Sequence, residues 1–96
     1  MADYRLTAEA DRDIFEIARF TLETWDEVQT DRYLNGLHDT FRELANEPTL
    51  GTKSDDVRPS YFRRRYRSHM IFYKPSRTGI LIVRVLHVRM DYLRHL

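Results

Sequence analysis

Side chains expected to be buried recur at helical spacing in the first half of the chain and at strand spacing in the second half. Between residues 8 and 25 they recur every three or four positions, which predicts a helix with one buried face. Thr7 precedes this run, and Glu9 and Asp11 lie in its first turn, as expected for the capped amino end of a helix. The face comprises Ala10, Ile14, Ile17, Thr21 and Trp25, and we expect Trp25 to close the core at the helix end.

A second helix is predicted to begin at Asp26-Glu27-Val28-Gln29 and to end at Asn46-Glu47-Pro48. Asp26 and Gln29 form a variant of the capping box at its start, and Pro48 follows its end. No loop residues separate the two helices around residues 25 and 26, so they should form an antiparallel hairpin. The apolar stripe of the second helix comprises Tyr33, Leu34, Leu37, Phe41 and Leu44.

Strand patterns surround this hairpin. Residues 2–6 alternate between polar and apolar side chains, and three further strands are expected at 61–67, 69–74 and 80–87, after a long connection over 47–59. The residues between 75 and 79 should join the last two strands as a hairpin. The predicted order is β-α-α-β-β-β in a single domain spanning residues 1–96. The fold class is α+β, with the helical hairpin packed on one face of a mainly antiparallel sheet.

The last strand is apolar on both of its expected faces. Ile80, Ile82 and Leu86 should share one face, and Leu81, Val83 and Val85 the other. The helical hairpin covers only one face, so the second needs a partner polypeptide or the C-terminal tail, and we expect a partner. The residues expected to meet this partner are Arg63, Arg65, Arg67, Met70, Phe72, Ile80 and Ile82.

The net charge of +1 conceals an asymmetry between the two halves. Residues 1–56 hold 14 acidic and 6 basic side chains, whereas residues 57–96 hold 1 acidic and 10 basic side chains. A basic face suits nucleic acid, a ribosome or an acidic protein, unless the two halves neutralise each other within the fold. The chain has no cysteine, and its first residues form no apolar signal region. We therefore expect a cytoplasmic protein without disulfides and without a membrane span.

Polar side chains gather abruptly after the last strand. General acid–base cleavage of RNA needs no metal. Here it could use Arg89 to stabilise the phosphorane charge and His87 or His95 to transfer the proton. In the alternative interpretation, His87 satisfies a backbone group and Arg89 pairs with Asp91. Neither a nucleophilic triad nor metal-ligand spacing is evident, so no cofactor or metal is expected.

Several short motifs, taken in order, resemble the ParE toxins within the RelE/ParE superfamily. The similarity is sharpest at Ile71-Phe72-Tyr73 and at Arg84-Val85-Leu86-His87, which continues to Arg89-Met90-Asp91. Weaker matches lie at Tyr4-Arg5-Leu6-Thr7, Ala10, Asp13-Ile14, Tyr33, Leu37, Leu44-Ala45, Pro48, Gly51 and Arg94-His95-Leu96.

This resemblance implies a toxin of a type II toxin–antitoxin module that inhibits DNA gyrase and is neutralised by a ParD-type antitoxin. The RelE branch instead cuts mRNA on the ribosome and places an arginine near the position of Met70, so a binding protein is favoured over an enzyme. Direct contact with nucleic acid is not expected without a partner. The residues expected to contact the target are Arg84, His87, Arg89, Asp91, Arg94 and His95.

Overall fold

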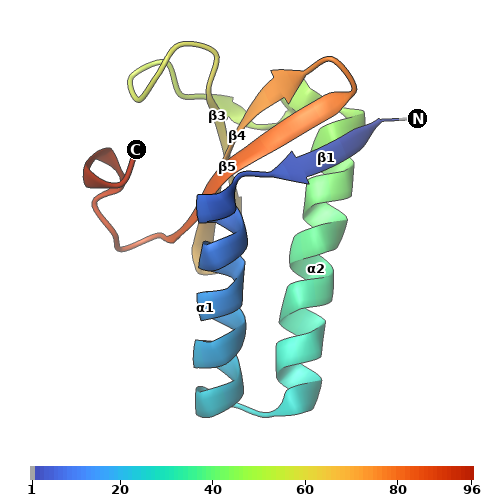
Figure 1. The fold of residues 1–96 in the computed structure, drawn as a ribbon, viewed down its shortest axis with the longest axis vertical. Helices are drawn as coiled ribbons and strands as arrows, with labels where there is room; N and C mark the ends of the chain where they lie inside the picture. The colour runs from blue at the N-terminus through green and yellow to red at the C-terminus, as the bar shows by residue number, and fades with distance from the viewer. Residues whose placement is uncertain (1) are drawn as a thin grey trace.

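A computed structural model describes residues 2–96 as a helical hairpin followed by one curved sheet (Figure 1). The five strands are arranged in the order β1-β5-β4-β3-β2. β1 (Asp3–Leu6) runs parallel to β5 (Gly79–His87), and the other neighbours are antiparallel. The predicted α+β class and element order are confirmed. No helix in residues 2–96 combines the length and hydrophobicity needed to cross a membrane.

Both helices begin at the predicted caps. α1 (Ala8–Thr24) starts after Thr7, whose side chain accepts a hydrogen bond from the backbone N–H of Ala10. α2 (Glu27–Asn46) starts after Asp26, whose carboxylate accepts from the backbone N–H of Gln29. Each cap satisfies an amide that has no partner within its own helix. The hairpin is therefore specified locally, at both of its helix starts.

The core lies between this hairpin and the sheet. Ala10 and Ile17 of α1 are buried, and so are Leu37, Phe41 and Leu44 of α2, as their spacing predicts. Trp25 contradicts its prediction, because its side chain is 62% exposed. Both helices extend well past the sheet in Figure 1, so the turn that carries Trp25 has no strand to pack against.

An irregularity in β5 changes which of its side chains face the helices. Phe72 of β4 (His69–Ser76) is opposite Arg84, whereas its neighbour Tyr73 is opposite Ile82, so Val83 is the extra residue of a bulge. Side chains on the two sides of the bulge therefore alternate out of step. Val85 joins Ile80 and Ile82 in the core, contrary to the predicted pairing of faces.

Three residues predicted to contact a partner are instead buried within the chain. Ile80 and Ile82 are completely buried in the hydrophobic core and have no surface to offer a partner. Phe72 lies outside that core cluster but is also fully buried. Its ring contacts Tyr92 of the C-terminal 3₁₀ turn η2 (Tyr92–Arg94), with 5.2 Å between ring centroids. The tail, rather than a partner, therefore covers Phe72.

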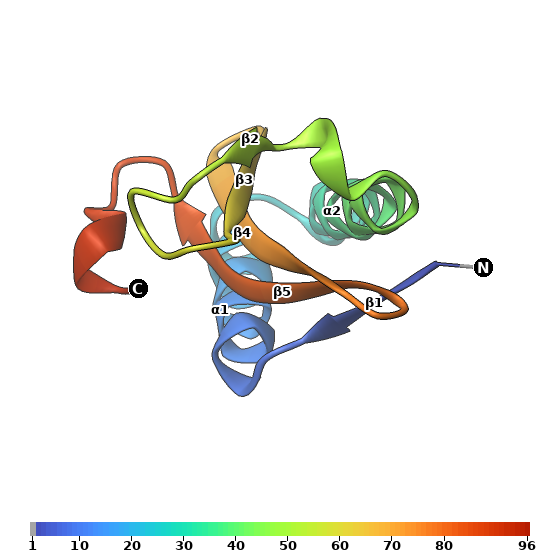
Figure 2. The same ribbon diagram turned by 90° about the horizontal axis from the view of Figure 1, so that it is seen from above.

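The remaining strands depart little from expectation. β3 (Phe62–Tyr66) ends one residue before Arg67, which has a positive φ of 50° and whose guanidinium lies over the Tyr66 ring. Arg67 therefore does not extend the arginine stripe of the strand. The connection over 47–59 contains the 3₁₀ turn η1 (Pro48–Leu50) and the two-residue strand β2 (Thr52–Lys53), neither of which was predicted. In Figure 2 the C-terminal segment lies across the strands from α2.

Candidate protein-binding site

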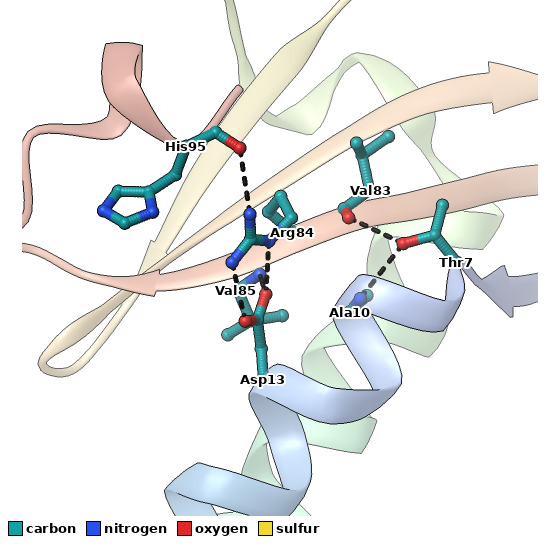
Figure 3. A network of polar contacts seen from close by, with 7 residues as sticks. All are labelled: Thr7, Ala10, Asp13, Val83, Arg84, Val85 and His95. Carbon is teal, nitrogen blue, oxygen red and sulfur yellow. Dashed lines mark hydrogen bonds and ion pairs between the residues drawn. The ribbon is translucent and has the colours of Figure 1, made fainter.

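Beyond the end of β1, the start of α1 lies beside β5 and forms hydrogen bonds with the backbone of that strand. The backbone N–H of Thr7 donates to the carbonyl of Ile82, and the Thr7 hydroxyl donates to the carbonyl of Val83 at 2.7 Å. Six residues after Thr7, the carboxylate of Asp13 in α1 accepts from the backbone N–H of Val85 at 3.0 Å (Figure 3). Side chains of a helix thus satisfy backbone groups that a neighbouring strand would otherwise bond.

Asp13 also holds Arg84 in a two-point ion pair. The guanidinium donates to both carboxylate oxygens, at 2.8 and 2.9 Å, and to the backbone carbonyl of His95 (Figure 3). Both side chains are largely buried, which strengthens the charge-assisted hydrogen bonds. The hydrogen bond with Asp13 raises the pKa of Arg84 above its ordinary value. Arg84 was predicted to bind the target, but its guanidinium is already paired within the chain.

A cavity of about 560 Å³ lies beside this ion pair. It lies between the second half of α1, the start of β4 and the end of β5. Its walls combine three exposed apolar side chains with imidazole rings. The lining residues used below are Phe20, Trp25, Met90, Tyr33, His69 and His87.

His69 and His87 stand opposite each other on neighbouring strands and line the cavity together. Their ring centroids are 5.4 Å apart, with the rings nearly perpendicular. The Nδ1 atom of His69 lies 2.6 Å from the Tyr33 hydroxyl, and the backbone N–H of Arg89 donates to Nδ1 of His87 at 3.1 Å. Burial lowers the pKa of His69 to about 4, with the neighbouring His87 adding to the shift. His69 is therefore neutral at pH 7.

The C-terminal residues predicted to contact the target fall into two groups. His87 and His95 line the cavity, whereas Arg89, Asp91 and Arg94 are exposed after the end of β5. Asp91 pairs with Arg94 at 3.6 Å, and not with Arg89 as the alternative interpretation supposed. His87 does satisfy a backbone group, as that interpretation held.

Most of the predicted antitoxin-binding arginines have partners within the chain. Arg63 donates to Ser54, lies 3.8 Å from the Asp56 carboxylate and stacks over the Tyr92 ring. Arg65 donates to the carbonyl of Arg67. Met70 is partly exposed on the same face. Ion pairs such as Arg84 with Asp13 also join the acidic and basic halves, so part of the charge asymmetry is neutralised internally.

Sequence reasoning missed several residues of this site. Phe20 lies off the buried stripe of α1, and an apolar side chain off the core stripe was a usable signal for an exposed surface. Tyr33 was assigned to the core stripe, and no local pattern pairs it with His69. No group of three metal-ligating side chains occurs in the described part of the chain, residues 2–96.

Comparison with known proteins identifies the family to which this chain belongs. The family described as "ParE toxin of type II toxin-antitoxin system, parDE" matches residues 4–92. The chain belongs to the ParE toxin family. Toxin ParE1 of Mycobacterium tuberculosis (strain H37Rv) is 35% identical over 94 residues, which is 97% of this chain and 96% of that toxin. Toxin ParE1 of Caulobacter vibrioides is 31% identical over 96 residues, covering 100% and 99% of the two chains.

Two further comparisons extend the ParE assignment. Toxin ParE of Escherichia coli is 34% identical over an alignment of 98 positions, covering 100% of this chain and 94% of that toxin. A structure described as the chromosomal ParDE TA system from P. aeruginosa superposes with a TM-score of 0.75. It covers 93% of this chain and 98% of the other at 14% identity, so it supports the shared fold alone. This chain is thus a ParE-type toxin of a type II toxin–antitoxin system.

Proposed function

We propose that this ParE-family toxin acts in the cytoplasm by binding and inhibiting DNA gyrase, and that a ParD-type antitoxin neutralises it. The observation that carries the proposal is the match to ParE toxins along nearly the whole chain. The RelE/ParE resemblance supplies gyrase as the expected target of this branch. A single domain of this size that inhibits by binding needs an accessible surface rather than a catalytic centre.

The target-binding surface in this proposal is the exposed segment that follows β5. Arg89 and Arg94 are exposed there, and Leu93 presents a large apolar side chain that is 62% exposed. Exposed arginines combined with an apolar anchor are common in protein–protein interfaces. Arg84 is left out of this surface because Asp13 already neutralises it.

The antitoxin is proposed to be an acidic, amphipathic polypeptide. The exposed apolar side chains of the hairpin include Phe20 and Trp25, and they give such a segment an apolar surface to cover. Its affinity should come chiefly from apolar burial, because exposed ion pairs contribute only about 0–1 kcal/mol each. Co-purification with the neighbouring gene product tests this part of the proposal. A free toxin that stays soluble, monomeric and indifferent to that product would refute it.

One observation favours the competing ribonuclease hypothesis. His69 and His87 lie side by side in a cavity, and paired imidazoles are one way to achieve acid–base cleavage of RNA. Both Nδ1 atoms already have partners, however, and Arg84, an arginine that lines the cavity beside them, is paired with Asp13 and is not free to stabilise a transition state. We therefore favour the gyrase-binding function.

Expression without antitoxin separates the two functions. Gyrase inhibition predicts loss of negative supercoiling and a DNA-damage response while mRNA stays intact. Arg89→Ala and Arg94→Ala should weaken gyrase binding, whereas the double variant His87→Ala, His95→Ala should retain inhibition if it still folds. Codon-specific mRNA cuts that disappear in a folded histidine variant would instead assign the ribonuclease activity.

A further inference from the structure

Each of the two cavity imidazoles has a hydrogen-bond partner at Nδ1. The Tyr33 hydroxyl lies 2.6 Å from Nδ1 of His69, where either group can be the donor. Nδ1 of His87 accepts a hydrogen bond from the backbone N–H of Arg89. A neutral imidazole that accepts at Nδ1 carries its proton on Nε2. His87 therefore presents an Nε2–H donor, and His69 presents a second when Tyr33 donates to its Nδ1. Residues 2–96 supply no partner for either Nε2 atom.

The other charged groups around the cavity are already paired. Arg84 is held by Asp13, and Arg19 lies between the carboxylates of Glu16 and Glu23, at 2.6 and 3.4 Å. The imidazoles of His69 and His87, on adjacent strands, are thus among the groups of the cavity that remain available to hydrogen-bond an occupant. A carboxylate can accept from both, one donor at each oxygen, whereas a doubly charged phosphate would lie unfavourably close to Asp13 and Glu16.

The apolar walls indicate the size of the occupant. Phe20 is 65% exposed, and Trp25 and Met90 are 62% and 47% exposed. A site shaped for a small metabolite encloses its ligand, so its walls have little exposure to lose. Here an occupant must extend beyond the cavity to cover these side chains. A polypeptide segment fits this geometry better than a free small molecule.

We propose that the cavity docks an acidic segment of the antitoxin, which places one carboxylate on the Nε2 atoms of His69 and His87 and an apolar side chain against Phe20, Trp25 and Met90. The inference deepens the proposed function and rests on it for the identity of the partner. It assigns recognition of the carboxylate to a pair of histidine side chains instead of the arginines of β3.

Nitrogen-15 NMR of the full chain tests the chemistry without the antitoxin. The probe is 3-phenylpropionate, which joins one carboxylate to one aromatic ring, and 3-phenylpropanol is its matched control. We expect both imidazoles to show the Nε2–H tautomer and both Nε2–H signals to shift with the carboxylate but much less with the alcohol. Imidazoles protonated at Nδ1, or signals that do not respond to the carboxylate, would overturn the proposal.

Affinity for the antitoxin encoded beside this toxin tests the partner. His87→Phe removes the donor but keeps a flat ring, whereas His87→Gln restores an N–H donor at about the position of Nε2. Loss of one hydrogen bond to a charged group predicts roughly 10- to 100-fold weaker binding for His87→Phe. His87→Gln should bind within about threefold of the wild type, since it keeps that donor.

His38→Gln is the matched control, because His38 also bonds a tyrosine, Tyr4, but lies outside the cavity. It should leave antitoxin affinity unchanged. Wild-type affinity in a folded His87→Phe variant would overturn the docking site and leave the proposed function standing. If the wild-type toxin itself does not bind the antitoxin, the proposed function fails and the docking proposal fails with it.

Discussion

At the scale of single residues, Asp13 connects the helical hairpin to the sheet. Its carboxylate accepts from the guanidinium of Arg84 and from the backbone N–H of Val85. Removing one partner from a largely buried charged pair leaves the other desolvated, and a hydrogen bond to a charged group is worth roughly 1.5–3 kcal/mol. Arg84→Ala should therefore lower the free energy of unfolding by about that amount.

Asp13→Ala should cost more than Arg84→Ala, because it also leaves the Val85 amide without an acceptor. Urea denaturation of both variants measures the difference in the free energy of unfolding. A smaller loss for Asp13→Ala would mean that the carboxylate is not the acceptor of the Val85 amide in solution.

His69 should make the stability of the toxin depend on pH. Its pKa is about 4 in the folded chain, and its ordinary value of 6.5 applies after unfolding. Between these two pKa values the unfolded chain binds the extra proton. The stabilising contribution of neutral His69 is complete above pH 6.5 and declines as the pH falls toward 4.

The variant His69→Asn should flatten this part of the stability curve, because an amide does not titrate. Thermal or urea unfolding at pH 7, 6 and 5 provides the comparison, with the exposed His95→Asn as the control. Equal loss of stability in wild type and His69→Asn between pH 6.5 and 5 would contradict the burial of this imidazole.

At the scale of elements, Thr7 joins the start of α1 to the edge of β5. Its side chain accepts from the backbone N–H of Ala10 and donates to the carbonyl of Val83. Loss of an N-terminal cap typically costs about 0.5–2 kcal/mol, so Thr7→Ala should fall in the upper part of that range. Thr7→Ser keeps the hydroxyl and should stay close to wild type. If chemical denaturation finds the two variants equally destabilised, the hydroxyl contacts are not what stabilises this junction.

The packing of α2 against β3 depends on a glycine. A methyl group at Gly36 would overlap the hydroxyl of Tyr66, which donates to the carbonyl of Tyr33. Gly→Ala within a helix normally gains about 1 kcal/mol, but Gly36→Ala should destabilise this fold. Tyr66→Phe removes the hydroxyl, so Gly36→Ala should cost less in that background. A double-mutant cycle in urea measures the coupling, and additive effects would argue against this contact.

The sequence was sufficient for the elements whose signals are local. The caps at Thr7 and Asp26, the α2 stripe and the end of α2 before Pro48 were all predicted correctly. The bulge at Val83 was not predictable, because alternation of side chains contains no sign of an inserted residue. Trp25 was misassigned because helical spacing gives its face but not the length of the sheet beneath it.

The candidate site depended on contacts between distant parts of the chain. His69, His87 and Tyr33 converge only after β4 pairs with β5 and α2 packs beside them. The sequence drew attention to His87 because it follows an apolar strand. It gave no reason to place His69 against His87, because strand register between two segments is fixed by the turn and the core that join them.

At the scale of the whole molecule, the toxin presents two adjoining surfaces. The hairpin and the end of the sheet enclose the cavity with its histidines, while Arg89, Leu93 and Arg94 are exposed in the segment after β5. His95 belongs to both regions, because it lines the cavity and its carbonyl binds Arg84. An antitoxin in the cavity would therefore lie close to the proposed gyrase-binding segment, which gives a physical route to neutralisation.

The central claim is that this toxin inhibits gyrase by binding it and that the antitoxin prevents this. The most direct measurement is supercoiling of relaxed plasmid by purified gyrase, titrated with purified toxin, with and without the antitoxin encoded beside it. Inhibition by binding predicts that toxin reduces supercoiling in proportion to its concentration and that equimolar antitoxin restores it. Supercoiling that proceeds at the same rate at every toxin concentration, with a toxin shown to be folded, would contradict the account.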